Sequence, residues 1–295
     1  MSVDAALDDA LRSDVDAIRL QRVARRRRLP TLWLGVAIVV AVCVSSAIGS
    51  LVYADPSAQD LLEALKPPSL AHPFGTDDLG RDVLARTLAA TWTDLGVAVG
   101  ATYLGLIIGT ALGTAAGYFR GWTERLIMRL TDVVIAFPFM VLVIAIVVVI
   151  GPGIKGVFVG LVTAGWALYA RLARAEMLVL KERSFVQAAQ TLGLSHRRVM
   201  LRHAVPNLIR PSLVFSMSDI VLNILLVASL SFLGLGAQPP TPEWGAIIAD
   251  GQGYLLTAWW ITTLPGLVVV IVGVGFSLIG DGLADSLRSR RTIVR

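Results

Sequence analysis

SFVQAAQTLGLSHRRVMLRHAVPN, residues 184–207, is the stretch that decides how the rest of the chain is interpreted. It is a polar island between two long apolar runs. Residues 185–192 are rich in good helix formers and predict a short helix. Gly193 then stands where a left-handed residue commonly ends a helix, and Ser195 is suited to cap a second one. Because proline cannot continue a helix interior, Pro206 is expected to stop that second helix.

The composition around this island is that of a membrane protein. Of the 295 residues, 55% are hydrophobic and only 16% are charged, and the mean hydropathy is +0.72. An apolar run of about twenty residues can cross a bilayer as a helix, which satisfies its own backbone within lipid. We therefore predict an all-α integral membrane protein with six transmembrane helices, at residues 31–53, 94–118, 126–150, 157–175, 208–235 and 258–279.

A glycine repeat marks the second of these spans. Gly105, Gly109, Gly113 and Gly117 recur every four residues and therefore share one face of the helix. Small residues at this spacing let two helices approach closely in a membrane. We expect another helix to pack on this face.

The basic residues predict which segments face the cytoplasm. They concentrate in the tail at 1–30, around residues 120–129, in the island and at the C-terminal end, whereas few lie in the segments between. Under the positive-inside rule, this bias places both chain ends and the island in the cytoplasm. The expected divisions are an N-terminal tail at 1–30, a first span at 31–53, an extracytoplasmic segment at 54–93, a core of five helices at 94–283 containing the loop 176–207, and a basic tail at 284–295.

The chain shows no pattern for catalysis or metal binding. It lacks the G-x-x-x-x-G-K-[ST] motif of ATP-hydrolysing proteins and has no recognisable nucleophile with a base. The lone Cys43 excludes an internal disulfide, and His72, His196 and His203 are scattered along the sequence. We expect a non-catalytic chain that carries no metal and no cofactor of its own.

Three interpretations of the island compete. Basic residues on its second helix give it a superficial likeness to a DNA-reading helix-turn-helix. However, apolar spans begin a few residues away on both sides, so a DNA duplex would have to lie against the bilayer. A rigid knob for a partner protein fits better, because the small Ala188 and Ala189 permit close approach. A purely structural hairpin stays open, although connections in helical bundles usually have only 2–8 residues.

Three motifs carry a resemblance to a known family. QAAQTLGLSHRRVMLRHAVPN, residues 187–207, resembles the cytoplasmic signature of ABC importer permeases, which reads E-A-A, three residues, Gly, nine residues, Ile, any residue, Leu-Pro. HPFGTDDLGRD at 72–82 resembles a second motif of the dipeptide and oligopeptide permeases, and SFLGLGAQPPTPEWG at 231–245 resembles a third. Within the signature, the matching residues are Ala188, Ala189, Gly193 and Pro206, and the departures are Gln187, His203 and Val205.

The resemblance implies a type I ABC importer permease fold in which the island is a cytoplasmic coupling helix. It implies that this chain forms a heterodimer with a second permease in a bacterial plasma membrane. One or two ATPase subunits would supply ATP and Mg²⁺ chemistry, and an extracytoplasmic binding protein would deliver substrate. The residues implied in ATPase coupling are Gln187, Ala188, Ala189, Leu192, Gly193, His196, Arg197, His203 and Pro206.

The other two motifs are expected on the extracytoplasmic side. There they are candidates to meet the second permease or the binding protein. The residues concerned are Gly75, Thr76, Asp77, Gly80, Arg81, Asp82, Trp244 and Gly245.

The cargo implied by the resemblance is dipeptides or oligopeptides. Nickel chelates and glutathione-like compounds are the alternative with the same architecture. A secondary transporter or membrane receptor is the alternative from another class, although no internal repeat supports a secondary transporter.

Two polar residues inside the fifth span are candidates for the substrate path. Asp219 and Asn223 lie four apart and hence on one helix face. Polar groups at membrane depth usually face a bundle interior or a water-filled path. Lining of the path and a hydrogen bond that only orients helices are both compatible with this spacing.

Overall fold

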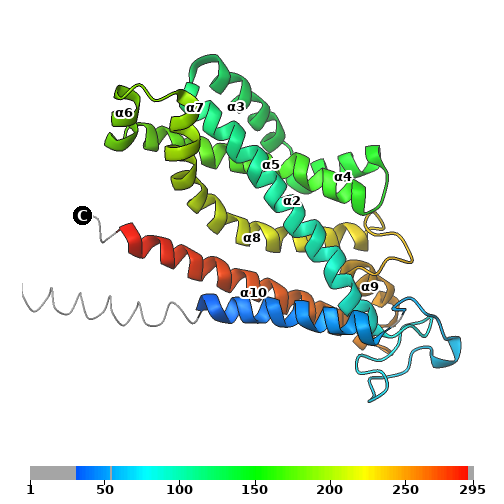
Figure 1. The fold of residues 1–295 in the computed structure, drawn as a ribbon. Helices are drawn as coiled ribbons and strands as arrows, with labels where there is room; N and C mark the ends of the chain where they lie inside the picture. The colour runs from blue at the N-terminus through cyan, green and yellow to red at the C-terminus, as the bar shows by residue number, and fades with distance from the viewer. Residues whose placement is uncertain (1–30, 54, 292–295) are drawn as a thin grey trace, which may run out of the picture.

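Long helices dominate the computed structural model, which describes residues 31–53 and 55–291 (Figure 1). Five helices of the described chain are long and apolar enough to cross a membrane, and the bent pair α3–α4 makes six if it counts as one span. The all-α prediction is confirmed. The helices are Thr31–Val52, η1 (Leu61–Glu63), α2 (Val83–Phe119), α3 (Gly121–Ala136), α4 (Phe139–Ile150), α5 (Ile154–Lys181), α6 (Ser184–Thr191), α7 (His196–Arg198), the π-helical η2 (Val199–Ala204), α8 (Val205–Phe232), α9 (Trp244–Asp250), η3 (Gln252–Tyr254) and α10 (Trp260–Arg291).

The predicted close approach at the glycine repeat is confirmed between α2 and α5. A Cβ placed on Gly109 would lie 2.2 Å from the carbonyl oxygen of Trp166, and one on Gly113 would lie 2.2 Å from that of Ala170. No side chain fits at such distances. The two backbones are therefore in direct contact, and this pair of helices forms the centre of the bundle.

The third span is not the single helix expected at 126–150. It breaks after Ala136, and α3 and α4 meet at an angle of 93°. The break has a local cause, because the α conformation is disfavoured for the residue before a proline. Phe137 accordingly takes an extended backbone, with φ −82° and ψ 140°, immediately before Pro138.

The second span begins at Val83, earlier than the expected residue 94. The side chain of Asp82 accepts a hydrogen bond from the backbone N–H of Ala85 and caps the helix start. Residues 83–93, which were expected in the extracytoplasmic segment, instead form the first part of this helix, and Arg86 among them is buried.

The expected stop at Pro206 is wrong. Helix α7 continues through η2 directly into α8, and Pro206 lies in the first turn of α8. Proline is tolerated there because the first backbone N–H groups of a helix have no partner within it.

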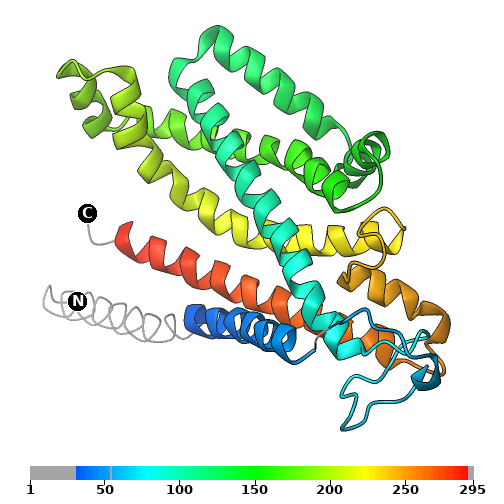
Figure 2. The same ribbon diagram turned by 45° about the vertical axis from the view of Figure 1, so that its right-hand side comes forward.

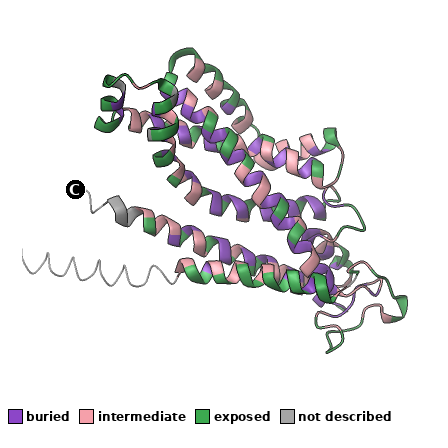
Figure 3. Ribbon diagram, in the orientation of Figure 1, coloured by how far each residue is buried: buried purple, intermediate pink, exposed green. Residues whose placement is uncertain are grey.

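The helices place the three sequence motifs at two opposite ends of the bundle. The start of Thr31–Val52, the last turn of α10, and α6 and α7 lie at one end, and η1 and α9 lie at the other (Figures 1 and 2). The first helix packs on α10, where a Cβ on Gly35 would lie 2.6 Å from the carbonyl oxygen of Gly275. Buried residues gather where α2, α5, α8 and α9 meet, whereas α3 presents mostly exposed residues (Figure 3).

Candidate functional site

The α6–α7 segment, residues 184–204, projects from one end of the bundle (Figure 1). Helix α6 ends in a tight reversal in which the N–H of Leu194 donates to the carbonyl oxygen of Ala189 at 3.2 Å. Gly193 has φ +71°, in the left-handed region that favours glycine. The predicted glycine turn is therefore confirmed, and it is what turns the chain between α6 and α7.

The segment presents a mixed surface at its tip. Leu192 is 80% exposed, and Phe185 is 42% exposed. Both alanines belong to α6, but Ala189 is buried in the cluster against α5, whereas Ala188 is exposed. The exposed residues among those predicted for coupling are Gln187, Ala188, Leu192, Gly193, His196 and Pro206.

The root of the segment is fixed to the bundle by an apolar cluster. Val186 and Val199 are fully buried, and they pack with Ala173 and Met177 of α5. Burying an aliphatic side chain stabilises by about 1.5–3 kcal/mol. The exposed tip therefore stands on a base that is continuous with the core of α5.

Tyr118, at the end of α2, adds polar contacts to this base. Its hydroxyl lies 2.8 Å from Nδ1 of His196, and its carbonyl oxygen accepts a hydrogen bond from Nζ of Lys181 at 2.9 Å. It thus joins the end of α5 to the start of α7. Sequence reasoning missed Tyr118 and Lys181, because nothing in the local pattern links positions so far apart.

Two residues predicted for coupling are only partly described. Arg197 lies in α7 and His203 in η2, but their side chains lie outside what the structure describes. Their contribution to the surface of the α6–α7 segment stays a prediction.

At the opposite end, the 72–82 motif folds around a buried carboxylate. Asp77 has no exposed surface, and it accepts hydrogen bonds from Nε of Arg81 and from Nη1 of Arg86, both at 2.6 Å. Asp250 completes the group at 3.3 Å from both guanidinium groups. Arg86 and Asp250 were missed, because they pair with the motif only in three dimensions.

The glycines of this motif allow tight backbone packing. Gly75 and Gly80 have φ values of +70° and +72°. A Cβ on Gly80 would lie 1.7 Å from the carbonyl oxygen of Asp60. Thr76 is buried, and its hydroxyl donates to the carbonyl oxygen of Glu63. Beside them, Nδ1 of His72 lies 2.7 Å from Asp82.

Trp244 ties the third motif to the same end of α2. Its ring N–H donates to the carbonyl oxygen of Thr87 at 3.0 Å, and its backbone N–H donates to Asp94 at 3.0 Å. Glu243 is also fully buried, and its carboxylate accepts from the N–H groups of Gly245 and Ala246. The motif residues predicted for one side of the protein therefore do lie together, in one buried network.

Asp219 and Asn223 lie inside the bundle. They are 6% and 3% exposed. The hydroxyl of Tyr169, on α5, donates to Asp219 at 2.8 Å, and the amide of Asn223 donates to the hydroxyl of Thr102, on α2, at 2.8 Å. These contacts are the interhelical hydrogen bonds expected if Asp219 and Asn223 orient the helices.

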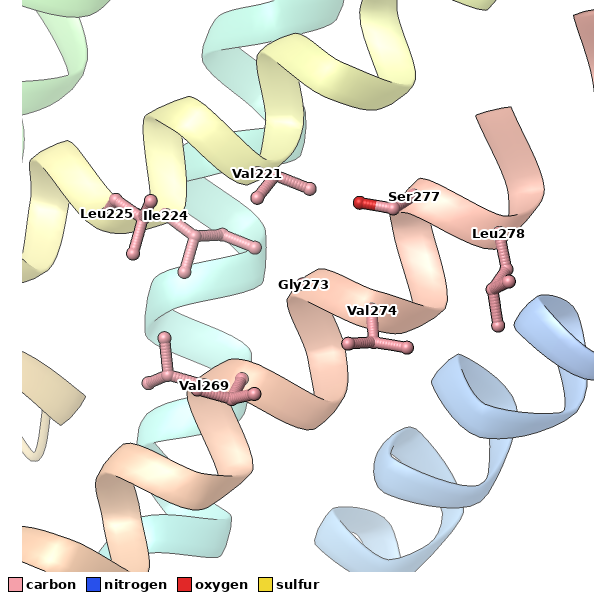
Figure 4. Close-up of a pocket in the computed structure, with 9 residues that line it drawn as sticks. Val221, Ile224, Leu225, Val269, Gly273, Val274, Ser277 and Leu278 are labelled. Atoms are coloured by element: carbon pink, nitrogen blue, oxygen red, sulfur yellow. The ribbon is translucent and has the colours of Figure 1, made fainter. Parts of the chain in front are cut away.

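A groove of about 340 Å³ lies between α8 and α10 (Figure 4). Its lining is aliphatic apart from Gly273 and the hydroxyl of Ser277, which points toward α8. Such a surface suits an apolar neighbour and offers little to the charged ends of a peptide. The lining residues are Val221, Ile224, Leu225, Val269, Val270, Gly273, Val274, Ser277 and Leu278.

Comparisons with known proteins agree with this architecture. Residues 109–293 match the family of binding-protein-dependent transport system inner membrane components. The glutathione transport system permease protein GsiD of Shigella boydii is 44% identical over 220 residues, which are 75% of this chain and 73% of that protein. GsiD of Escherichia coli strain UTI89 is 43% identical over 220 residues, which are again 75% of this chain and 73% of that protein.

A solved structure shares the fold. The MetNI methionine ABC transporter, in an inward-facing conformation, matches with a TM-score of 0.55 at 18% identity, covering 70% of this chain and 95% of that one. The type I ABC importer permease fold predicted from the motifs is thereby confirmed. With its apolar helices, the chain is a multi-pass bacterial inner-membrane protein. It belongs to the family of binding-protein-dependent transport system inner membrane components and is an ABC importer permease subunit.

Proposed function

We propose that this chain and a second permease form the passage of an ATP-driven importer for small peptides, with glutathione-like tripeptides among its cargo. The observation that carries this proposal is how the α6–α7 segment is attached to the bundle. Its tip exposes the apolar Leu192, and its base is packed into the same helices that cross the membrane. A partner that grips the tip therefore acts on α5 and α8 directly.

The proposed partner at the tip is an ATPase subunit that binds ATP and Mg²⁺. A dimer of such subunits closes on nucleotide and opens after hydrolysis, so it offers two states. If the two states grip the α6–α7 segment differently, each favours a different arrangement of the membrane helices. In this scheme, the permease itself contributes no catalytic residue.

The proposed orientation places the α6–α7 segment in the cytoplasm. Basic residues gather at that end of the bundle, as the positive-inside rule requires of a cytoplasmic face. They come from the α2–α3 turn, the end of α5 and the α6–α7 segment, and they include Arg120, Arg125, Lys181, Arg183 and Arg198. Both chain ends would then be cytoplasmic. The buried network around Asp77 and Trp244 would hold the extracytoplasmic surface that meets a binding protein.

The cargo class is inferred from the relatives. The GsiD proteins are named as glutathione transport permeases, and glutathione is itself a small peptide. Both peptide and glutathione uptake are consistent with the motifs. Nickel chelates are the alternative cargo.

Reconstitution of the whole complex tests the proposal. The chain is purified in mild detergent with its co-purifying chains, which are identified by mass spectrometry and transferred to vesicles. We expect a second permease, ATPase subunits and a binding protein, and ATP-dependent uptake of peptides or glutathione. Uptake without an ATPase partner, or uptake of nickel chelates alone, would contradict it.

A further inference from the structure

An exposed ion pair lies on the outer face of α3 and α5. Nη2 of Arg171 donates to Oδ1 of Asp132 at 2.8 Å, and their side chains are 52% and 59% exposed. Both residues belong to helices that are candidates to cross the membrane. Exposed charges of this kind require an explanation, because lipid cannot solvate them.

The pair is distant from the helix ends. At about 1.5 Å per residue, Arg171 lies about 15 Å before the end of α5 at Lys181, and Asp132 lies about 17 Å after the start of α3 at Gly121. The hydrocarbon core of a membrane is only about 30 Å thick. Both charges therefore lie within their helices and not at the helix ends.

The surroundings of the pair form a continuous open face. Arg125, Arg129 and Asp132 follow one another on one exposed side of α3, and Leu168, Arg171 and Ala175 do so on α5. Helices α3 and α5 pack against each other, so their open sides adjoin (Figure 2).

The broken span gives an independent indication of water at the same place. The backbone between α3 and α4 is non-helical at Phe137 and Pro138, and both residues are exposed. Non-helical backbone at membrane depth is tolerated only where protein buries it or where it lines a water-filled cavity. The described chain does not bury it. The break at Phe137 and the nearby Asp132 of the ion pair thus both require a polar neighbour.

A dry contact with a second permease fits this face poorly. The core of a protein interface is depleted of charged residues. Two charges that are each more than half exposed still present hydrogen-bonding atoms that need water or a charged ligand.

We propose that the open face of α3 and α5 lines a water-filled passage, in which Asp132 and Arg171 bind the charged termini of a zwitterionic peptide. Arg171 receives the carboxylate and Asp132 receives the ammonium group, so the solute replaces one ion pair by two. This inference rests on the proposed import of peptides. In it, the peptide lies outside the buried cluster around Asp219.

Cysteine labelling tests the water-filled passage. The sequence has one cysteine, so Cys43→Ser gives a cysteine-free background. Leu168→Cys, at a 37% exposed position one turn before Arg171, is introduced into this background, and Val40→Cys, at a 51% exposed position of the first helix, serves as the lipid-facing control. The whole complex, in vesicles, is treated with a membrane-impermeant, charged methanethiosulfonate. We expect Leu168→Cys to react at least about tenfold faster than Val40→Cys, and more slowly when transported peptide is present. Equal rates for the two variants would overturn the proposal, as would a rate that peptide does not change.

Charge selectivity tests the binding role. We expect Asp132→Asn to lower the uptake of a free dipeptide by about tenfold and to leave its N-acetylated form, which has no ammonium group, unchanged. Glu124→Gln is the matched control, because Glu124 pairs with Arg174 between the same two helices but is only 19% exposed. Equal losses for both peptides would mean that Asp132 is merely structural and would overturn the proposal. If the Cys43→Ser complex imports no peptide at all, the proposed function fails; if it imports peptide but Asp132→Asn shows no selectivity, only this inference fails.

Discussion

Two residues of α5, Tyr169 and Arg171, lie only two positions apart and face opposite environments. Tyr169 is 1% exposed and donates to Asp219 across to α8. The side chain of Arg171 is 52% exposed and pairs with Asp132 of α3. Both contacts join α5 to another helix, and their lengths are the same, at 2.8 Å.

The difference lies in what surrounds each contact. Around Tyr169, the protein itself supplies every neighbour, so the loss of one partner leaves a buried polar group unsatisfied, at a cost of about 1–3 kcal/mol. Around Arg171, solvent or a solute completes the contact, and exposed ion pairs contribute only about 0–1 kcal/mol. Polarity within a span therefore does not by itself mark a transport path. Exposure separates the contact that holds the fold from the one available for function.

The largest expected effect on stability is at Asp77, which is the most deeply buried of these charged residues. Asp77→Leu leaves the guanidinium groups of Arg81 and Arg86 without their shared carboxylate. Breaking a buried ion pair by removing one partner costs about 3–5 kcal/mol. We expect little assembled complex to be recovered, as measured by size-exclusion chromatography in detergent. Asp78→Asn, at a neighbouring and more exposed carboxylate, is the control and should assemble normally.

Asp219→Leu should have the next largest effect. It leaves the hydroxyl of Tyr169 buried without its acceptor, and we expect a loss of about 1–3 kcal/mol in the free energy of unfolding. Thermal unfolding of the purified complex measures this, and Asp219→Asn should recover most of the loss because it keeps an acceptor. Normal stability but abolished uptake in Asp219→Leu would instead assign Asp219 to the substrate path.

Arg171→Gln should have the smallest effect on stability. We expect the free energy of unfolding to change by less than about 1 kcal/mol, because the pair that it breaks is exposed. Uptake of free peptide should nevertheless fall, and Arg171→Lys should retain part of it by keeping the positive charge. A destabilisation as large as that of Asp219→Leu would remove the distinction between the two faces of α5.

Much of the architecture could be predicted, because it depends on patterns among neighbouring residues. Apolar runs located the membrane helices, and the four-residue glycine repeat indicated the contact between α2 and α5. Gly193 marked the turn between α6 and α7. Each of these depends on neighbouring positions, which a single sequence displays directly.

The errors arose where distant residues decide the local structure. Residues 83–93 were expected in the extracytoplasmic segment, but they belong to α2, and Arg86 among them pairs with the distant Asp77. Pro138 is the exception, because it was expected within an intact span and breaks that span by 93° for a local reason, the extended backbone of the residue before it. The polar contacts of Tyr118 with His196, and of Asp132 with Arg171, are equally invisible in sequence, since each joins two helices.

The same limit applies to the candidate site. The motif residues of the α6–α7 segment were found by their pattern, but the burial of Ala189 and the exposure of Leu192 follow from how α6 sits on α5. Which surface a partner can reach is therefore a property of packing.

The central claim is that the α6–α7 segment transmits ATP hydrolysis to the membrane helices, and Gly193→Val tests it most directly. Valine in a left-handed conformation is strongly disfavoured, whereas open space surrounds the site, so the turn should distort without a clash. The measurement is the number of peptides imported per ATP hydrolysed by the reconstituted complex. Gly253→Val, at an equally open glycine of the opposite end, is the control. We expect Gly193→Val to assemble in the membrane and to lose at least about tenfold in this ratio, while the control keeps it. An unchanged ratio in Gly193→Val would contradict the claim.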